Sequence, residues 1–296
     1  MAVARLNSEN CYSVAAPEMV PDSTRLLNRL NACSRGGCVL LGFDFPIGLP
    51  AAYCQRAGIN SFLNILPALG NGCWSEFYEV ATDRSQIGFR RPFYPHAPGG
   101  RSQQHLLNAL NVKDMRDLLR ECELATKART AASPLFWTLG AKQVGRAAIA
   151  GWRDVLAPAM RDNEPRVKLW PFAGALDKLL ASSQIVIVES YPAEACVQIG
   201  LGAPGRGWSK RNQADRQRFS PTVQNWAQVH GIGLEASLVA LLDQGFGSSP
   251  FGDDMFDAVV GLFGMLDVIQ GNDSYDAPAG AEVQTVEGWI FGLPEA

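Results

Sequence analysis

The sequence predicts an α/β fold, because two short apolar runs alternate with stretches of helical spacing. Val39-Leu-Leu-Gly-Phe43 and Ile185-Val-Ile-Val-Glu189 are continuous apolar runs of the kind that forms buried parallel strands. Helices are expected at 23–33, 103–124, 173–182 and 253–266. The composition agrees, since 47% of the 296 residues are apolar and 19% are charged, as in an ordinary globular protein with a large core.

The first element expected along the chain is a β-hairpin, with strands at 2–6 and 11–15 joined by a polar turn. The helix at 23–33 follows, with Ser23 as its candidate N-cap and leucines in helical spacing. Asp44 stands at the end of the first apolar strand, and Glu189 ends the second. Both strands are then stopped by proline-containing segments.

The bulk properties narrow the classes of protein that are possible. A net charge of −3 argues against a globally basic nucleic-acid binder but leaves room for a local basic groove. The seven cysteines form no CxxC pair and are expected to be reduced thiols of a cytosolic protein. No signal peptide and no apolar run of about 18 residues is visible. We therefore expect a cytoplasmic protein without a membrane partner.

Two carboxylates at strand ends are the first candidates for a functional site. Ligands of open α/β sheets bind beyond the carboxyl ends of the strands. Asp44 and Glu189 would share that edge if their strands are parallel neighbours. A turn or capping role is the alternative for Asp44, and an ion pair with the basic stretch at 206–218 is the alternative for Glu189.

A pair of aspartates near the start of the last helix is the second candidate. Asp254 and Asp257 are three residues apart and project from one helix face, while the rest of the helix is apolar. Like charges on a mostly buried helix resist desolvation unless a cation lies between them. Mg²⁺ or Mn²⁺ suits such oxygen ligands, and two metals about 4 Å apart can serve phosphodiester chemistry. Asp253 fits a capping and dipole role instead.

Four motifs carry a resemblance to a known family: Gly42-Phe-Asp-Phe-Pro-Ile-Gly-Leu-Pro50, Glu189-Ser-Tyr-Pro-Ala-Glu194, Asp253-Asp-Met-Phe-Asp-Ala258 and Glu287-Gly-Trp-Ile290. The chain resembles domain-of-unknown-function family 429, whose members are regarded as predicted nucleases. The resemblance implies an RNase H-like three-layer mixed sheet flanked by helices. It also implies a single domain over 1–296, with a core at 1–50 and 183–296 and a mainly helical insertion at about 51–182.

Within that wider fold, the Asp254-x-x-Asp257 pair is similar to the paired aspartates of RuvC-type Holliday junction resolvases. Asp44 would match the acidic residue on their fourth strand. The resemblance implies that Asp44, Asp254 and Asp257 are metal ligands and catalytic residues, with Glu189 as a further ligand or water-orienting group. Such proteins open with an aspartate-bearing strand that residues 1–22 lack. Either the start codon lies upstream or this copy has lost a ligand, and without that aspartate we expect weak or no activity.

The basic stretch at 206–218 is a candidate substrate surface. Lys210 is the first choice for a phosphate contact, because members of the resembled family tend to carry a lysine after the strand-glutamate motif. Arg211 would add charge, and Trp208 could stack on a base. A solvated loop or helix face is the alternative. The Arg- and Pro-rich loop at 89–104 is either a substrate lid or an ordinary insertion.

The expected function is that of a metal-dependent nuclease or phosphodiesterase acting on nucleic acid or another phosphodiester. One alternative is a non-catalytic binding or regulatory protein that retains the fold. Another is an ATP-using member of the same superfamily, which the missing glycine-rich phosphate loops disfavour. A nucleophilic pair of Cys196 and His230 has no local support in the sequence.

Overall fold

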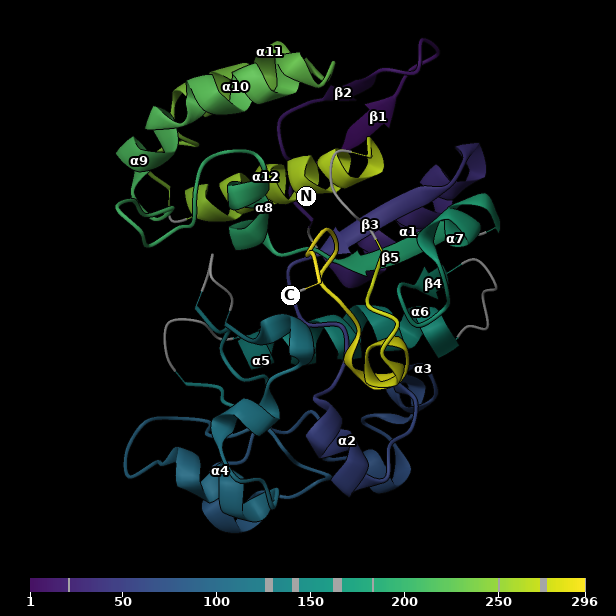
Figure 1. Cartoon of the computed structure of the whole chain (residues 1–296), viewed down its shortest axis with the longest axis vertical. Coiled ribbons are helices and arrows are strands. Elements are labelled where there is room, and N and C mark those ends of the chain that lie inside the picture. Colours follow the sequence, from purple (N-terminus) through teal and green to yellow (C-terminus); the bar gives the residue numbers. More distant parts are fainter. Residues whose placement is uncertain are drawn as a thin grey trace. The chain divides into compact units, whose positions relative to one another are not determined.

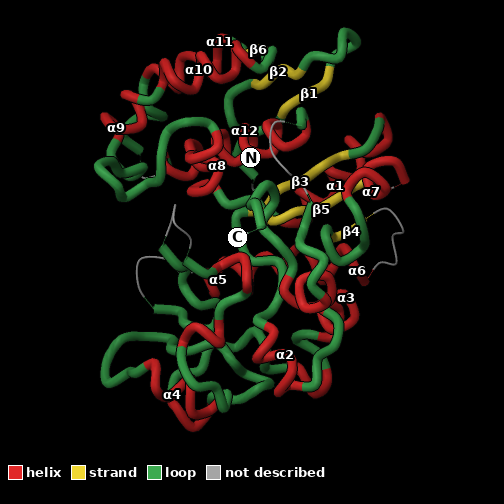
Figure 2. Tube along the Cα trace, viewed as in Figure 1, coloured by secondary structure: helices red, strands yellow, loops and turns green. Residues whose placement is uncertain are grey.

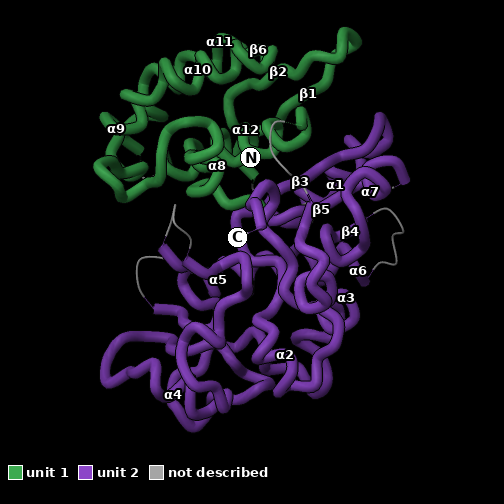
Figure 3. The backbone as a smooth tube through the Cα atoms, viewed as in Figure 1, with its two compact units in different colours: residues 1–21, 190–275 green, residues 22–189, 276–296 purple. Residues whose placement is uncertain are grey.

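The computed structural model describes residues 1–20, 22–125, 130–139, 144–161, 167–182, 184–249, 251–271 and 276–295. The chain forms two compact units, each assembled from two separate stretches of sequence (Figure 3). Unit 1 comprises Met1–Pro21 and Ser190–Tyr275, and unit 2 comprises Asp22–Glu189 and Asp276–Ala296. The helical insertion expected at about 51–182 falls inside unit 2.

The sheet of unit 2 consists of three parallel strands in the order β3-β5-β4 (Figures 1 and 2). Their bounds are Val39–Phe43 for β3, Ile185–Glu189 for β5 and Val167–Leu169 for β4. Every residue of the central strand β5 is buried, which explains its unbroken apolar sequence. Phe43 pairs with Glu189, so the two strands predicted from their apolar runs are parallel neighbours that end together.

Helix α1 (Ser23–Cys33) confirms the helix expected at 23–33, with one correction at its start. The N-cap is Asp22 rather than Ser23, because the Asp22 carboxylate accepts a hydrogen bond of 2.8 Å from the backbone N–H of Arg25. Helix α7 (Leu176–Ser182) lies within the helix expected at 173–182.

The helix expected at 103–124 is wrong as a continuous element. The chain forms α4 (Gln103–Ala109) and then two short 3₁₀ turns, η5 (Met115–Leu118) and η6 (Glu121–Glu123). Asn111 adopts a positive φ of 50°, which ends the first helix. Asp114 then caps a new turn by accepting a hydrogen bond of 2.6 Å from the N–H of Arg116. Local capping therefore overrides the apolar spacing of this segment.

The other elements of unit 2 are short helices and turns around an aromatic core. They are η1 (Ser34–Gly36), α2 (Ala51–Ala57), α3 (Phe62–Ile65), η2 (Leu66–Ala68), η3 (Gly72–Trp74), η4 (Arg84–Gln86), α5 (Val144–Gly151), η7 (Trp152–Leu156), α6 (Ala157–Arg161) and η8 (Val283–Glu287). Phe62, Phe77 and Trp152 form the centre of the core and are fully buried. The ring of Trp152 lies 5.3 Å from that of Phe62 and 6.3 Å from that of Phe77.

Unit 1 contains the predicted hairpin, which is confirmed as an antiparallel pair of β1 (Ala4–Leu6) and β2 (Tyr12–Val14). Strand β6 (Gly233–Leu234) adds to β2 in parallel. The helices are α8 (Pro192–Gln198), α9 (Gln213–Arg218), α10 (Ser220–Val229), α11 (Ala236–Asp243) and α12 (Gly252–Ile269). Across the described residues the strands thus form two three-stranded sheets, and the α/β class is confirmed.

Helix α12 runs through the core of unit 1 and packs closely on α8. Small residues permit this approach, since a Cβ added to Gly264 would lie 2.7 Å from the Cβ of Ala195. Apolar residues on several sides of α12, including Val259 and Phe263, are fully buried. No described helix, α12 included, has the length and apolar character needed to cross a membrane.

Candidate functional site

The three aspartates near the start of α12 differ in their exposure to solvent. Asp253 and Asp254 belong to the first turn, where carboxylates interact favourably with the helix dipole. Asp254 is exposed. Asp257 lies one turn further in, and only 14% of its side chain is exposed. Asp254 and Asp257 thus lie on one helix, as predicted.

Lys210 and Asp257, both predicted as site residues, form an ion pair in unit 1. The ammonium of Lys210 donates to Oδ2 of Asp257, and the Lys210 side chain is 35% exposed. Burial raises the pKa of the Asp257 carboxyl, and the neighbouring ammonium of Lys210 opposes this rise. Oδ1 of Asp257 is buried and has no hydrogen-bond partner in the described part of the chain. Among the described residues, the Asp257 carboxylate thus has one hydrogen-bonded oxygen and one without a partner.

The basic stretch holds Lys210 through buried neighbours. Arg216 is 3% exposed, and its guanidinium donates to the carbonyl oxygens of Lys210, Gly245 and Gly247. Trp208 is a core residue with 7% exposure, and its ring contacts those of Phe219 and Phe256. This packing leaves little ring surface on which a base could stack.

Arg211, the third predicted substrate contact, is exposed beside Lys210. Its backbone N–H donates to the Ser209 hydroxyl over 3.4 Å. The guanidinium of Arg211 forms no hydrogen bond or ion pair with the described residues. Replacing Arg211 therefore removes one positive charge without breaking an ion pair.

Replacement of Lys210 with methionine tests whether this ammonium stabilises the buried carboxylate. We expect Lys210→Met to lower the free energy of unfolding by about 1–2 kcal/mol at neutral pH. This loss lies between those typical of breaking an exposed ion pair and a buried one. The loss should grow with pH. A raised folded-state pKa means that the contribution of Asp257 to stability is full below the ordinary aspartate pKa and is lost as pH rises through the folded value.

Urea unfolding at pH 4, 6 and 8 in the presence of a chelator measures this pH dependence, and Arg211→Met is the matched control. We expect the control to differ little from the wild type at every pH. An equal loss at all three pH values would show that Lys210 acts by packing rather than by charge.

The strand-end carboxylates Asp44 and Glu189 belong to unit 2, whereas α12 belongs to unit 1. The shared metal site predicted for Asp44 with Asp254 and Asp257 stays a prediction. Asp44 is exposed at the end of β3. Glu189 is 5% exposed, and its carboxylate binds a buried arginine rather than solvent. Glu189 thus forms an ion pair, but with Arg120 and not with the basic stretch at 206–218 that the sequence suggested.

Arg120 lies at the centre of a buried polar network in unit 2 and is fully buried. Its two terminal nitrogens each donate to one oxygen of Glu189 over 2.7 Å, which makes the pair bidentate. The same guanidinium donates to the Glu123 carboxylate over 2.9 Å and to the Glu287 carbonyl over 3.1 Å. Burial by itself would lower the pKa of Arg120, but the acidic groups around it hold that pKa well above its usual value.

Three segments that carry the sequence motifs meet at this network. The backbone N–H of Ile47 donates to Glu189 over 2.7 Å. The carboxylate of Glu287 accepts hydrogen bonds of 2.8 Å from the N–H groups of Ala51 and Glu121. Burial raises the pKa of Glu287, and these two backbone donors oppose the rise. The motifs at 42–50, 189 and 287–290 thus join one another through Arg120, a residue that no sequence pattern indicated.

The Cys196–His230 alternative finds no support in unit 1. Cys196 is fully buried, and burial raises the pKa of its thiol to about 12, so a thiolate does not form near neutral pH. His230 stacks on Trp226, and its Nδ1 lies 2.7 Å from the Trp226 carbonyl oxygen. Its Nε2 lies 3.6 Å from Asp267. The imidazole is therefore engaged by other groups.

Within the described ranges, no group of three or more His, Cys, Asp or Glu side chains is arranged to hold a metal ion. No family model matches the chain, and neither a curated protein nor a solved structure matches it significantly.

Proposed function

We propose that this chain is a metal-dependent phosphodiesterase of the RNase H-like kind, with its acidic centre at the start of α12. One observation carries the proposal: Oδ1 of Asp257 is buried without a partner among the described residues, on the helix face that also bears the exposed Asp254. A buried, unsatisfied carboxylate oxygen is energetically unfavourable, and a hard cation is a suitable partner for it.

The residues present fit a hydrated Mg²⁺ or Mn²⁺, because Mg²⁺ usually keeps several waters and is held by one or two carboxylates. Asp257 and Asp254 would hold it. When bound, such a metal stabilises negative charge on a phosphodiester and lowers the pKa of a bound water. Lys210 positions Asp257 through their ion pair, and its partly exposed ammonium is placed to attract a phosphate. Glu189 is not included, since both its oxygens bind Arg120.

A second function, that of a non-catalytic binding protein, is favoured by the same ion pair. Lys210 already supplies a positive charge to Asp257, so the buried carboxylate is partly compensated without a metal. In such a protein the acidic residues would be structural, and the surface around Lys210 and Arg211 would bind an anionic partner without cleaving it.

The test compares the wild type with Asp257→Asn in Mn²⁺ titration calorimetry and in hydrolysis of bis(4-nitrophenyl) phosphate, DNA and RNA. We expect Asp257→Asn to weaken Mn²⁺ binding by about tenfold or more, since one charge-assisted ligand is lost. Hydrolysis should fall by about 100-fold. Asp253→Asn is the matched control, because Asp253 lies on the same helical turn as Asp254 and has a dipole role; we expect it to retain both properties.

Coincident Mn²⁺ isotherms for the wild type and Asp257→Asn would contradict the metal site. Mn²⁺ binding without hydrolysis of any of the three substrates would contradict the phosphodiesterase and favour the binding protein. Circular dichroism of each variant shows whether the fold is retained.

A further inference from the structure

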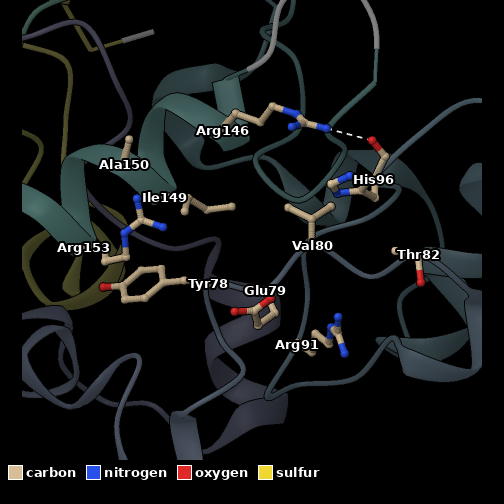
Figure 4. Close-up of a pocket in the computed structure, with 10 residues that line it drawn as sticks. All are labelled: Tyr78, Glu79, Val80, Thr82, Arg91, His96, Arg146, Ile149, Ala150 and Arg153. Atoms are coloured by element: carbon tan, nitrogen blue, oxygen red, sulfur yellow. Dashed lines mark hydrogen bonds between the residues drawn. The ribbon is translucent and has the colours of Figure 1, made fainter.

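Unit 2 contains a cavity of about 440 Å³ (Figure 4), and the residues that line it include none of the Arg120 network. One wall is the stretch 78–82 together with Arg91 and His96. The facing wall is formed by α5 and the following π turn, which contribute Arg146, Ile149 and Arg153. Its volume lies in the range of about 300–1,000 Å³ that is usual for small-molecule sites. The loop at 89–104, a lid candidate from its sequence, supplies two of these lining residues.

Three arginines line the cavity, and each retains donors that the described residues do not use. Arg146 donates to the carbonyl oxygen of His96 over 2.8 Å and has no carboxylate partner among the described residues (Figure 4). Arg153 binds its neighbour Asp154 through Nε and one terminal nitrogen, at 2.7 and 2.9 Å. Arg91 lies 3.6 Å from the exposed carboxylate of Glu76. Because a guanidinium has five N–H donors, each arginine can still donate to a ligand.

The polar atoms left without partners around the cavity can all donate. Three of the seven buried, unsatisfied side-chain atoms of the described residues belong to residues that line it: Oη of Tyr78 and Nε of Arg91 and Arg146. Burial raises the pKa of Tyr78, which keeps this phenol protonated as a donor. These three atoms are themselves closed to solvent, so a ligand in the cavity would meet the remaining N–H donors of the arginines. Guanidinium groups bind phosphate oxygens in particular.

The other lining residues indicate which further chemical groups the ligand contains. Glu79, on the wall formed by 78–82, is an acceptor, and it suits a hydroxyl group of the ligand. Val80, Ile149 and Ala150 add apolar surface to the lining, to which the ring of Tyr78 also belongs. Phosphate, hydroxyl and flat apolar parts occur together in a nucleotide.

We propose that this cavity binds a small phosphate ester of nucleotide size, with its acceptor oxygens held by Arg146 and Arg153 at separate positions and a sugar hydroxyl by Glu79. The inference goes beyond the proposed function, because every residue it uses belongs to unit 2 and none belongs to the acidic helix of unit 1. It also requires no metal.

The experiment is isothermal titration of the full chain, in the presence of EDTA, with adenosine 5′-monophosphate, adenosine and inorganic phosphate. We expect the nucleotide to bind at least tenfold more tightly than either of its parts. Arg146→Gln and Arg153→Gln should each weaken nucleotide binding by tenfold or more, while Arg35→Gln, an exposed arginine of the same unit, should leave it within twofold. Among the described residues Arg153 binds only its sequence neighbour Asp154, so that variant should keep its fold even if Arg146→Gln releases the His96 loop.

Absence of nucleotide binding to the wild type would overturn the proposal, and so would equal binding by the wild type and Arg153→Gln. Equal affinity for adenosine would contradict the phosphate subsite. Equal affinity for inorganic phosphate would contradict a ligand of nucleotide size. Because EDTA removes divalent metal, none of these results depends on the acidic site of α12.

Discussion

Arg120→Met is expected to lower the free energy of unfolding by about 3–5 kcal/mol, the range for removal of one partner from a buried ion pair. Arg120 is fully buried, and Glu189 and Glu123 are 5% and 2% exposed. Without the guanidinium, two buried carboxylates lose their positive partner, and the desolvation of each remains unfavourable. Methionine roughly retains the apolar volume of the arginine stem, so the loss reports mainly charge and hydrogen bonding.

Arg120→Met should also weaken particular backbone hydrogen bonds. The Glu189 carboxylate that Arg120 holds also accepts the N–H of Ile47, and Glu287, whose carbonyl binds Arg120, accepts the N–H groups of Ala51 and Glu121. Hydrogen–deuterium exchange should therefore show faster exchange at these three amides in Arg120→Met. Urea unfolding measures the accompanying loss of stability.

Two comparisons separate charge from packing at Arg120. Arg116→Met changes an exposed arginine four residues earlier, and we expect it to remain within about 0.5 kcal/mol of the wild type. Adding Glu189→Gln to Arg120→Met removes one uncompensated charge and should recover part of the lost stability. No recovery in the double variant would show that the buried charge is not the source of the destabilisation.

Strands β3 and β5 of unit 2 could be predicted because their signal is local, whereas β4 was not predicted. Residues 185–189 are apolar without interruption, and β5 is buried along its whole length. The same reasoning fails at 103–124, where leucine spacing suggests one helix but Asn111 and Asp114 end and restart it. Turn chemistry at two polar residues outweighs apolar periodicity there.

The networks could not be predicted, because their members are distant in sequence. Arg120 binds Glu189 from 69 residues away and the carbonyl of Glu287 from 167 residues away. Lys210 and Asp257 were each predicted as site residues, yet nothing local indicates that they pair across 47 residues. Residue type identifies candidates for chemistry, whereas the partner of a buried charge depends on which segments the fold brings together.

Gly48→Ala is expected to destabilise unit 2 by about 3 kcal/mol or more. Gly48 has a φ of +142°, where a side chain adds strain of about 1–3 kcal/mol. A Cβ there would also overlap the backbone carbonyl of Glu287 and lie 3.0 Å from that of Val286. Overpacking against atoms that cannot move away adds a further 1–3 kcal/mol or so.

The carbonyl of Glu287 is held in place from several sides, which makes relief of this overlap unfavourable. The Glu287 carboxylate accepts hydrogen bonds from the N–H groups of Ala51 and Glu121, and the Glu287 carbonyl accepts one from Arg120. The N–H of Leu49 donates to the carbonyl oxygen of Val286 over 2.7 Å, so the two segments are also hydrogen-bonded at the point of contact. A shift at 286–287 would therefore disturb the Arg120 network as well.

Gly37→Ala is the control that isolates this contact, because Gly37 has a similar φ of +153° but no atom within 4 Å of an added Cβ. Strain alone should make Gly37→Ala mildly destabilising, and Gly48→Ala should exceed it by the overpacking contribution in urea unfolding. Faster amide exchange at Glu121 is expected in Gly48→Ala only. Equal losses in the two variants would contradict the close approach of the 42–50 and 287–290 segments, and with it the role of Gly48 in allowing both motifs to reach Arg120.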